Sequence, residues 1–143
     1  MKLAFYFQQN SPHAKNHECA RKMAEAQVLA GHQKISMLAL GPHMALGCVH
    51  TEPSAGRIPF LYQATNGNVL AISGVPIDMR LDTAGKIKSI VDKDYREAAK
   101  ILKSFDGAFA ALFWDNVNRK LVVVTDFLGY QPLYIYQDSH ESC

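Results

Sequence analysis

Cysteine is scarce in this sequence. Its 143 residues include only Cys19, Cys48 and Cys143, and no two of them form a Cys-x-x-Cys pair. An odd number of cysteines without such a pair argues against both a disulfide framework and a zinc knuckle. We therefore expect buried thiols in a reducing compartment.

Long apolar runs and an excess of one charge are also missing. No stretch approaches the roughly 18 apolar residues of a membrane span, and the N-terminus lacks the basic and apolar regions of a signal peptide. Lysine and arginine number 15 against 13 acidic residues, which gives a net charge of +2. The densest basic stretch, residues 86–103, is interrupted by acidic side chains. We expect a cytoplasmic protein with no nucleic-acid and no membrane partner.

Motifs for cofactors and metals are absent as well. The sequence holds neither a Gly-x-x-x-x-Gly-Lys-Ser phosphate loop nor a Ser-Gly-Gly-x-Asp-Ser pyrophosphate loop, so we expect no cofactor in this chain. His13 and His17 are four residues apart and close to Cys19, a spacing that can bind a metal from one helix face. The spacing places no third ligand beside them. We interpret both as surface histidines and predict no metal site.

The pattern of apolar residues predicts an α+β domain. Helices are predicted at residues 16–30, ended by Gly31, and at 95–104, capped by Asp92 or Asp94. Asn66-Gly67 predicts a tight hairpin turn, whereas residues 74–90 predict a loop and irregular extended pieces. Strands are predicted at residues 2–7, 35–40, 44–49, 60–64, 69–73, 108–114, 121–125 and 133–137. Short turns favour antiparallel pairing, and strands covered on both faces require a layered sandwich.

Two segments in the second half of the chain carry a family resemblance. Residues 105–115 read Phe-Asp-Gly-Ala-Phe-Ala-Ala-Leu-Phe-Trp-Asp, and residues 126–136 read Asp-Phe-Leu-Gly-Tyr-Gln-Pro-Leu-Tyr-Ile-Tyr. They resemble two motifs of the glutamine amidotransferase domain in the asparagine synthetase family. The resemblance implies the four-layer αββα sandwich of the N-terminal-nucleophile hydrolases. It also implies that residues 1–143 form one such domain and that the synthetase domain is absent from this chain.

The catalytic residues of that family are poorly matched. Its nucleophile is a cysteine at the first position of the mature chain, whereas this sequence begins with Met1 and Lys2, and Lys2 is too large for ordinary removal of the initiator methionine. The arginine that grips the substrate carboxylate falls near Cys48, whose neutral thiol cannot replace a bidentate guanidinium. The Asn-Gly pair of the oxyanion hole appears as Ser73-Gly74, so the amide donor is lost. We therefore expect no catalytic residues.

Within this family, β-lactam synthetases and lasso peptide cyclases are similar in lacking the leading cysteine. They adenylate a carboxylate in an ATP-binding domain, and an amine already present on the substrate attacks it, so ammonia is not needed. The resemblance thus implies a degenerate domain with a structural or docking role in an ATP-dependent amide-forming enzyme. Its expected partner is a synthetase domain or subunit, which would bind ATP and Mg²⁺.

Two other functions remain open from the sequence. The chain could be an active glutamine amidohydrolase that uses Cys19 or Cys48 as an internal nucleophile. It could instead be a free-standing protein-binding module that forms a homo-oligomer through exposed sheet edges.

Overall fold

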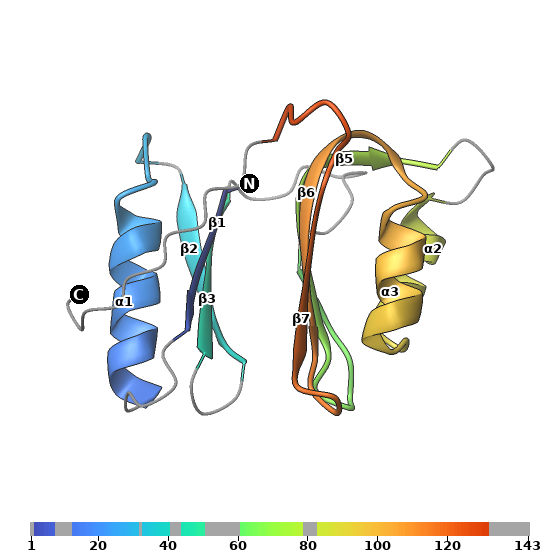
Figure 1. Ribbon diagram of the computed structural model, residues 1–143. Coiled ribbons are helices and arrows are strands. Elements are labelled where there is room, and N and C mark those ends of the chain that lie inside the picture. Colours follow the sequence, from blue (N-terminus) through green and yellow to red (C-terminus); the bar gives the residue numbers. More distant parts are fainter. Residues whose placement is uncertain are drawn as a thin grey trace.

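The architecture is a sandwich of four layers. The computed structural model describes residues 2–7, 13–31, 33–40, 44–50, 61–78 and 83–131. In these residues one helix covers the outer face of the first sheet, the two sheets face each other, and two helices cover the outer face of the second sheet (Figure 1). The predicted α+β class and its αββα layering are confirmed.

The first sheet is built around a central strand. It has the order β1-β3-β2, from β1 (Lys2–Phe7), β3 (Met44–His50) and β2 (Lys34–Ala39), and both pairings are antiparallel. Helix α1 (His13–Glu25) packs on its outer face. A Cβ atom added to Gly47 of β3 would lie 2.9 Å from both the Ala20 carbonyl oxygen and the Ala24 Cβ atom. Small residues on both elements therefore let the helix approach the sheet closely.

Helix α1 ends five residues earlier than its sequence pattern predicts. Beyond Glu25 the backbone tightens, because the Gln27 N–H donates to the Ala24 carbonyl at 2.9 Å and the Val28 N–H to the Glu25 carbonyl at 3.1 Å. The Gln33 side chain accepts from the Leu29 N–H at 2.7 Å. These local bonds replace helical ones, so the predicted end at Ala30 and the cap at Gly31 are wrong.

The second sheet has four antiparallel strands in the order β4-β5-β6-β7. Their bounds are β4 (Leu61–Gln63), β5 (Val69–Ile77), β6 (Asp106–Asp115) and β7 (Lys120–Thr125). Strand β5 thus continues beyond Ser73, where the sequence pattern had placed its end. The strand predicted at residues 133–137 lies outside the described residues.

Two short helices cover the second sheet. Helix α2 (Thr83–Ile90) occupies a segment for which the sequence predicted irregular structure, so that prediction is wrong. One face of this helix is buried, through Ile87 and Ile90. Its first turn holds no acidic residue and its interior holds Gly85, so its sequence lacks the start signal and the helix propensity that mark α3. Helix α3 (Tyr95–Leu102) begins at the predicted cap, where the Asp94 carboxylate accepts two backbone N–H bonds at 2.9 Å.

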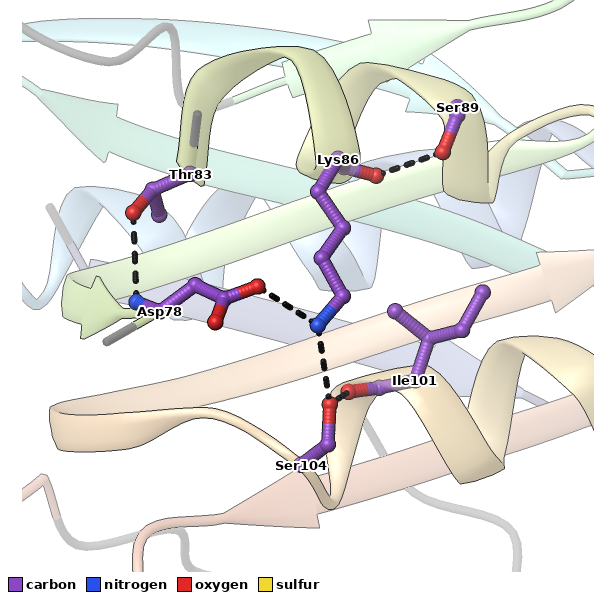
Figure 2. A network of polar contacts seen from close by, with 6 residues as sticks. All are labelled: Asp78, Thr83, Lys86, Ser89, Ile101 and Ser104. Carbon is purple, nitrogen blue, oxygen red and sulfur yellow. Dashed lines mark hydrogen bonds and ion pairs between the residues drawn. The ribbon is translucent and has the colours of Figure 1, made fainter. Parts of the chain in front are cut away.

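A polar network fastens α2 to its neighbours (Figure 2). The Lys86 ammonium donates to the Asp78 carboxylate at 2.6 Å and to the Ser104 hydroxyl at 3.2 Å. The Thr83 hydroxyl in turn accepts from the Asp78 N–H at 3.1 Å. The network thereby ties the end of β5 to α2 and to the chain just beyond α3.

The apolar core between the sheets draws side chains from both. Leu46 and Cys48 of β3 pack in one cluster with Ala71 of β5 and Leu112 and Trp114 of β6. A second cluster lies between the outer face of the second sheet and its helices, around Ile72, Phe109 and Phe113. Strands β5 and β6 are therefore covered on both faces, as the continuous apolar sequence of residues 108–114 predicts for β6. No helix in the described residues is long and apolar enough to cross a membrane.

Candidate functional site

The residues predicted to matter for function come from both sheets. Strand β1 begins beside the end of β3, with Lys2 paired to Val49, and β1 contacts β5. In Figure 1 the start of β1, the last part of β5 and the loop after β7 lie at the same end of the sandwich. Met1 and the Lys2 side chain lie outside the described residues. The described strand Lys2–Phe7 contains no cysteine, serine or threonine.

Cys48, which the sequence resemblance puts near the family's arginine, lies deep in the core between the sheets. Its side chain is 1% exposed and packs among apolar residues of both sheets. Burial raises the pKa of its thiol to about 12. A thiol with that pKa stays protonated near pH 7 and is a poor nucleophile. It also carries no positive charge with which to bind a carboxylate.

Cys19 is not available as a free thiol either. It is buried on α1, and it is disulfide-bonded. The expectation that the buried cysteines are all free thiols is therefore wrong at this position. A sulfur held in a disulfide cannot attack an amide.

The pair His13 and His17 lies on the same helix, α1. The side chain of His13 is outside the described part of the chain, and His17 is half-buried. Among the described residues, no three His, Cys, Asp or Glu side chains gather in a way that could hold a metal ion. The interpretation of both histidines as surface residues stays a prediction.

The structure brings together a serine and a histidine that the sequence did not single out. The Ser36 hydroxyl and His50 Nε2 are 2.8 Å apart across β2 and β3. In hydrolases such a contact can activate a serine. Here it links diagonal neighbours, since Ser36 pairs with Cys48 and His50 with Lys34. It satisfies two half-buried polar side chains beside the apolar core, and this is the role we assign to it.

A second polar contact of this kind joins Lys86 and Ser104. A serine beside a lysine can also be a nucleophile and its base. The Lys86 ammonium, however, is held in an ion pair by Asp78, and the Ser104 hydroxyl donates to the Ile101 carbonyl at 2.7 Å (Figure 2). An ammonium that donates hydrogen bonds cannot take up the serine proton, so this network is structural.

Ser73 and Gly74, which the sequence resemblance assigns to the family's oxyanion motif, lie on β5. Gly74 has φ +90°, and an added Cβ atom would clash with the Ala108 carbonyl oxygen on β6. Only glycine accommodates this backbone and this close approach of two strands. Ser73 is 6% exposed, and its hydroxyl donates to Oε1 of Gln131 at 3.4 Å.

The loop of residues 126–131 is organised by one buried carboxylate. Asp126 Oδ1 accepts from the N–H groups of Leu128 and Tyr130 at 3.0 Å, and Oδ2 accepts from that of Gln131 at 3.1 Å. Burial acts to raise the pKa of Asp126, but these donors outweigh it and hold the pKa below its usual value. The sequence shows Asp126 only as part of a turn motif. An aspartate three residues before a glycine does signal a turn built on its side chain.

The site therefore combines two elements: the stretch of β5 at Ser73-Gly74, where Gly74 has φ +90°, and the ordered loop that carries Gln131. Cys48 lies in the core between the sheets and packs with Ala71 of the same strand, β5. Two of the residues singled out from the sequence, Ser73 and Gly74, meet Gln131, which the sequence did not indicate. The structure thus supplies a glycine bend and a carboxamide that fills the space beside it.

Comparison with known proteins agrees with this geometry. The sequence matches the glutamine amidotransferase domain family over residues 67–143, which is more than half of the chain. The matched segment contains β5 with Ser73-Gly74, strand β6 and the loop organised by Asp126. A search of curated proteins finds no match. On the strength of the family match, this chain belongs to the glutamine amidotransferase domain family.

Proposed function

We propose that this domain does not hydrolyse glutamine and that it has a structural and docking role in an ATP-dependent, asparagine synthetase-like enzyme that forms amides. The observation that carries the proposal is the state of the sulfur atoms. Cys48 is sealed in the core with its pKa raised to about 12, and Cys19 is disulfide-bonded. Neither can serve as the internal nucleophile of an amidohydrolase.

The oxyanion position supports the same conclusion. Opening an amide places negative charge on the carbonyl oxygen, and removing one preorganised donor costs about 10²–10³ in rate. By resemblance, Ser73 stands where the family has an asparagine, so the carboxamide donor of the family is replaced by a hydroxyl, and this hydroxyl donates to Gln131. A single hydroxyl in place of the carboxamide supports a weakened oxyanion site.

The proposed parent reaction does not need ammonia. By resemblance to β-lactam synthetases and lasso peptide cyclases, a synthetase partner would adenylate a carboxylate with ATP and Mg²⁺. An amine on the same substrate would then attack the acyl carbon and displace AMP. Such an enzyme retains the amidotransferase domain for its contacts, and its glutaminase residues are free to change.

Exposed apolar side chains offer a surface for such contacts. In the loop held by Asp126, Phe127 is fully exposed, and Leu128 and Tyr130 are each 67% exposed. The hydrogen bonds of Asp126 order this loop while its apolar side chains stay exposed, so the loop is prepared for binding before a partner arrives. Exposed apolar patches of this kind mark interaction surfaces.

An ammonia-release assay tests the absence of glutaminase activity. The purified chain is incubated with L-glutamine, with and without a thiol-directed glutamine analogue, and ammonia is measured. We expect no release above that of buffer. Release that the analogue blocks, and that Cys48→Ala abolishes, would overturn the proposal in favour of an amidohydrolase that uses an internal cysteine.

A binding assay tests the docking role. The chain is co-expressed with an asparagine synthetase-like synthetase domain, and co-purification is compared for the unchanged chain, Phe127→Ser and Val117→Ser. Val117 is a matched control, since it is 73% exposed but lies in the turn at the other end of β7. We expect Phe127→Ser alone to weaken co-purification. Equal loss in both variants, or no association at all, would contradict the docking surface and favour a free-standing module.

A further inference from the structure

The space beside the Ser73-Gly74 bend is filled by a side chain of the same protein. Gln131 Oε1 accepts a hydrogen bond from the Ser73 hydroxyl at 3.4 Å. A Cβ atom added to Gly74 would come within 2.9 Å of Gln131 Cγ. The stem of Gln131 thus lies against Gly74 while its carboxamide oxygen faces Ser73.

The backbone of the loop holds Gln131 in this position. Its N–H donates to Asp126 Oδ2 at 3.1 Å, and the N–H of Asp126 itself donates to the Phe109 carbonyl on β6 at 2.8 Å. Phe109 is the strand partner of Gly74. The loop is therefore anchored to β6, the strand that pairs with Gly74. This anchor holds the Gln131 side chain beside Ser73, although the two residues are 58 positions apart in the sequence.

From this arrangement we propose that Gln131 acts as an internal carboxamide that closes the remnant oxyanion site to external primary carboxamides, including free glutamine. The inference rests on the proposed function, because it takes Ser73-Gly74 as the remnant of that site. A glutamine side chain and a free glutamine end in the same group, –CO–NH₂. The carbonyl oxygen of Gln131 accepts from Ser73 as the oxygen of a bound amide would.

The internal ligand gives Gln131 a specificity-determining role. Because it is part of the chain, it competes with any external amide at a high effective concentration. Removing the side chain should therefore raise the apparent affinity for a primary carboxamide by about tenfold or more. The external amide then binds without first having to displace Gln131.

NMR titration tests this assignment. L-glutamine is added to the ¹⁵N-labelled chain and to Gln131→Gly, and the amide signals of Ser73 and Gly74 are followed. We expect saturable shifts in Gln131→Gly at concentrations that leave the unchanged chain unaffected. L-norvaline, whose side chain carries no carboxamide, should produce no such shifts in either protein.

Two further variants separate space filling from loss of the fold. Gln131→Met fills the same space but has no oxygen to accept from the Ser73 hydroxyl, so it should respond at concentrations between those for the unchanged chain and for Gln131→Gly. Gln131→Ala should open the site if the glycine variant does not fold. The proposal is overturned if the unchanged chain responds as Gln131→Gly does, or if Gln131→Met stays as closed as the unchanged chain. It is overturned equally if folded Gln131→Gly and Gln131→Ala do not respond, or if L-norvaline shifts the same signals.

The titration and the ammonia assay can fail independently. Ammonia release by the unchanged chain would refute the proposed function, whatever the titration shows. If the Ser73 and Gly74 signals of folded Gln131→Gly and Gln131→Ala do not shift with L-glutamine, and no ammonia is released, the role of Gln131 is refuted and the proposed function stands.

Discussion

The two halves of the sandwich are held together by different means. In the first half, α1 lies on its sheet through small residues such as Ala20, Ala24 and Gly47, which permit close contact. In the second half, buried polar side chains bind the ends of strands and helices to one another. Asn68, Asp115 and Asp126 are buried, with at most 7% of each exposed, and accept or donate several hydrogen bonds.

Asn68 and Asp115 illustrate the second mode. Asn68 Nδ2 donates to the carbonyls of Val91 and Lys93, and its Oδ1 accepts from the N–H of Asn116. Asp115 Oδ2 accepts from the N–H of Tyr95 at 2.9 Å. The start of β5, the turn after β6 and the segment between α2 and α3 are thereby joined at one corner.

The family match falls on the half that contains these side chains. Residues 67–143 match the glutamine amidotransferase domain family, and this segment contains Asn68, Asp115 and Asp126, each a polar hub, that is, a buried side chain with several hydrogen bonds. A hub requires one particular side chain at one position, whereas a small-residue contact tolerates several. Four predictions test this contrast.

The largest effect is expected from Asp115→Ala. It removes an acceptor from the N–H groups of Tyr95 and Asn118 and from Asn118 Nδ2, and leaving such buried donors unpaired should lower the unfolding free energy by about 3 kcal/mol. Urea denaturation followed by fluorescence of the single tryptophan, Trp114, measures it. The exposed carboxylate Asp92 supplies the control, and an equal loss in Asp92→Ala would show that Asp115 is not a hub.

A somewhat smaller loss is expected from Gly47→Val in the first half. The added side chain would meet the backbone of α1 at Ala20, and overpacking of this kind should cost about 2 kcal/mol. Gly31→Val is the matched control, since nothing lies within 4 Å of a Cβ atom there. The same urea experiment compares the two, and similar midpoints would mean that α1 is not closely packed on the sheet.

Asn16→Leu should instead stabilise the first half. Asn16 is fully buried on α1, and within the described part of the chain neither its Nδ2 nor its Oδ1 has a hydrogen-bond partner. Replacing it by an apolar residue of similar size should raise the unfolding free energy by about 1.5 kcal/mol. Asn68→Leu provides the contrast, because Asn68 is as buried but fully bonded, and should destabilise. A loss of stability in Asn16→Leu would place a hub in the first half as well.

The smallest effect concerns Cys48, which lies between the halves. Its pKa rises from 9.0 to about 12 on folding, so only the unfolded chain ionises between those values. The free energy of unfolding that comes from keeping this thiol neutral is fully present below pH 9, and it is lost as the pH rises toward 12. From pH 8 to pH 10 the loss should be about 1.4 kcal/mol, measured against Cys48→Ala to remove other titrations. Identical pH dependence in both proteins would show that the thiol is not sealed in the core.

The sequence predicted most of the elements but not their limits or their contacts. Strands β1 and β6, the turn at Asn66-Gly67 and the cap at Asp94 follow from side chains that act within a few residues of themselves. Helix α2 was missed because its first turn has no acidic residue and its interior contains Gly85. The end of α1 was misplaced because the local bonds beyond Glu25 compete with helical ones.

The candidate site divides in the same way. Its residue types and the family resemblance were readable in the chain, since Ser73-Gly74 and the motif from Asp126 are local patterns. The contact between Ser73 and Gln131, and that between Ser36 and His50, could not be read. Each depends on how separate strands and loops are brought together, which no local pattern specifies.

The amino-acid sequence by itself determined the alternation of apolar residues, the turns and the caps, because these depend on backbone geometry and on near neighbours. It thereby determined an α+β sandwich. Only the tertiary structure decided that Cys48 is enclosed and that Gln131 reaches Ser73. Burial and long-range hydrogen bonds exist only once the sheets are packed, and they set the pKa of the thiol and the occupancy of the site.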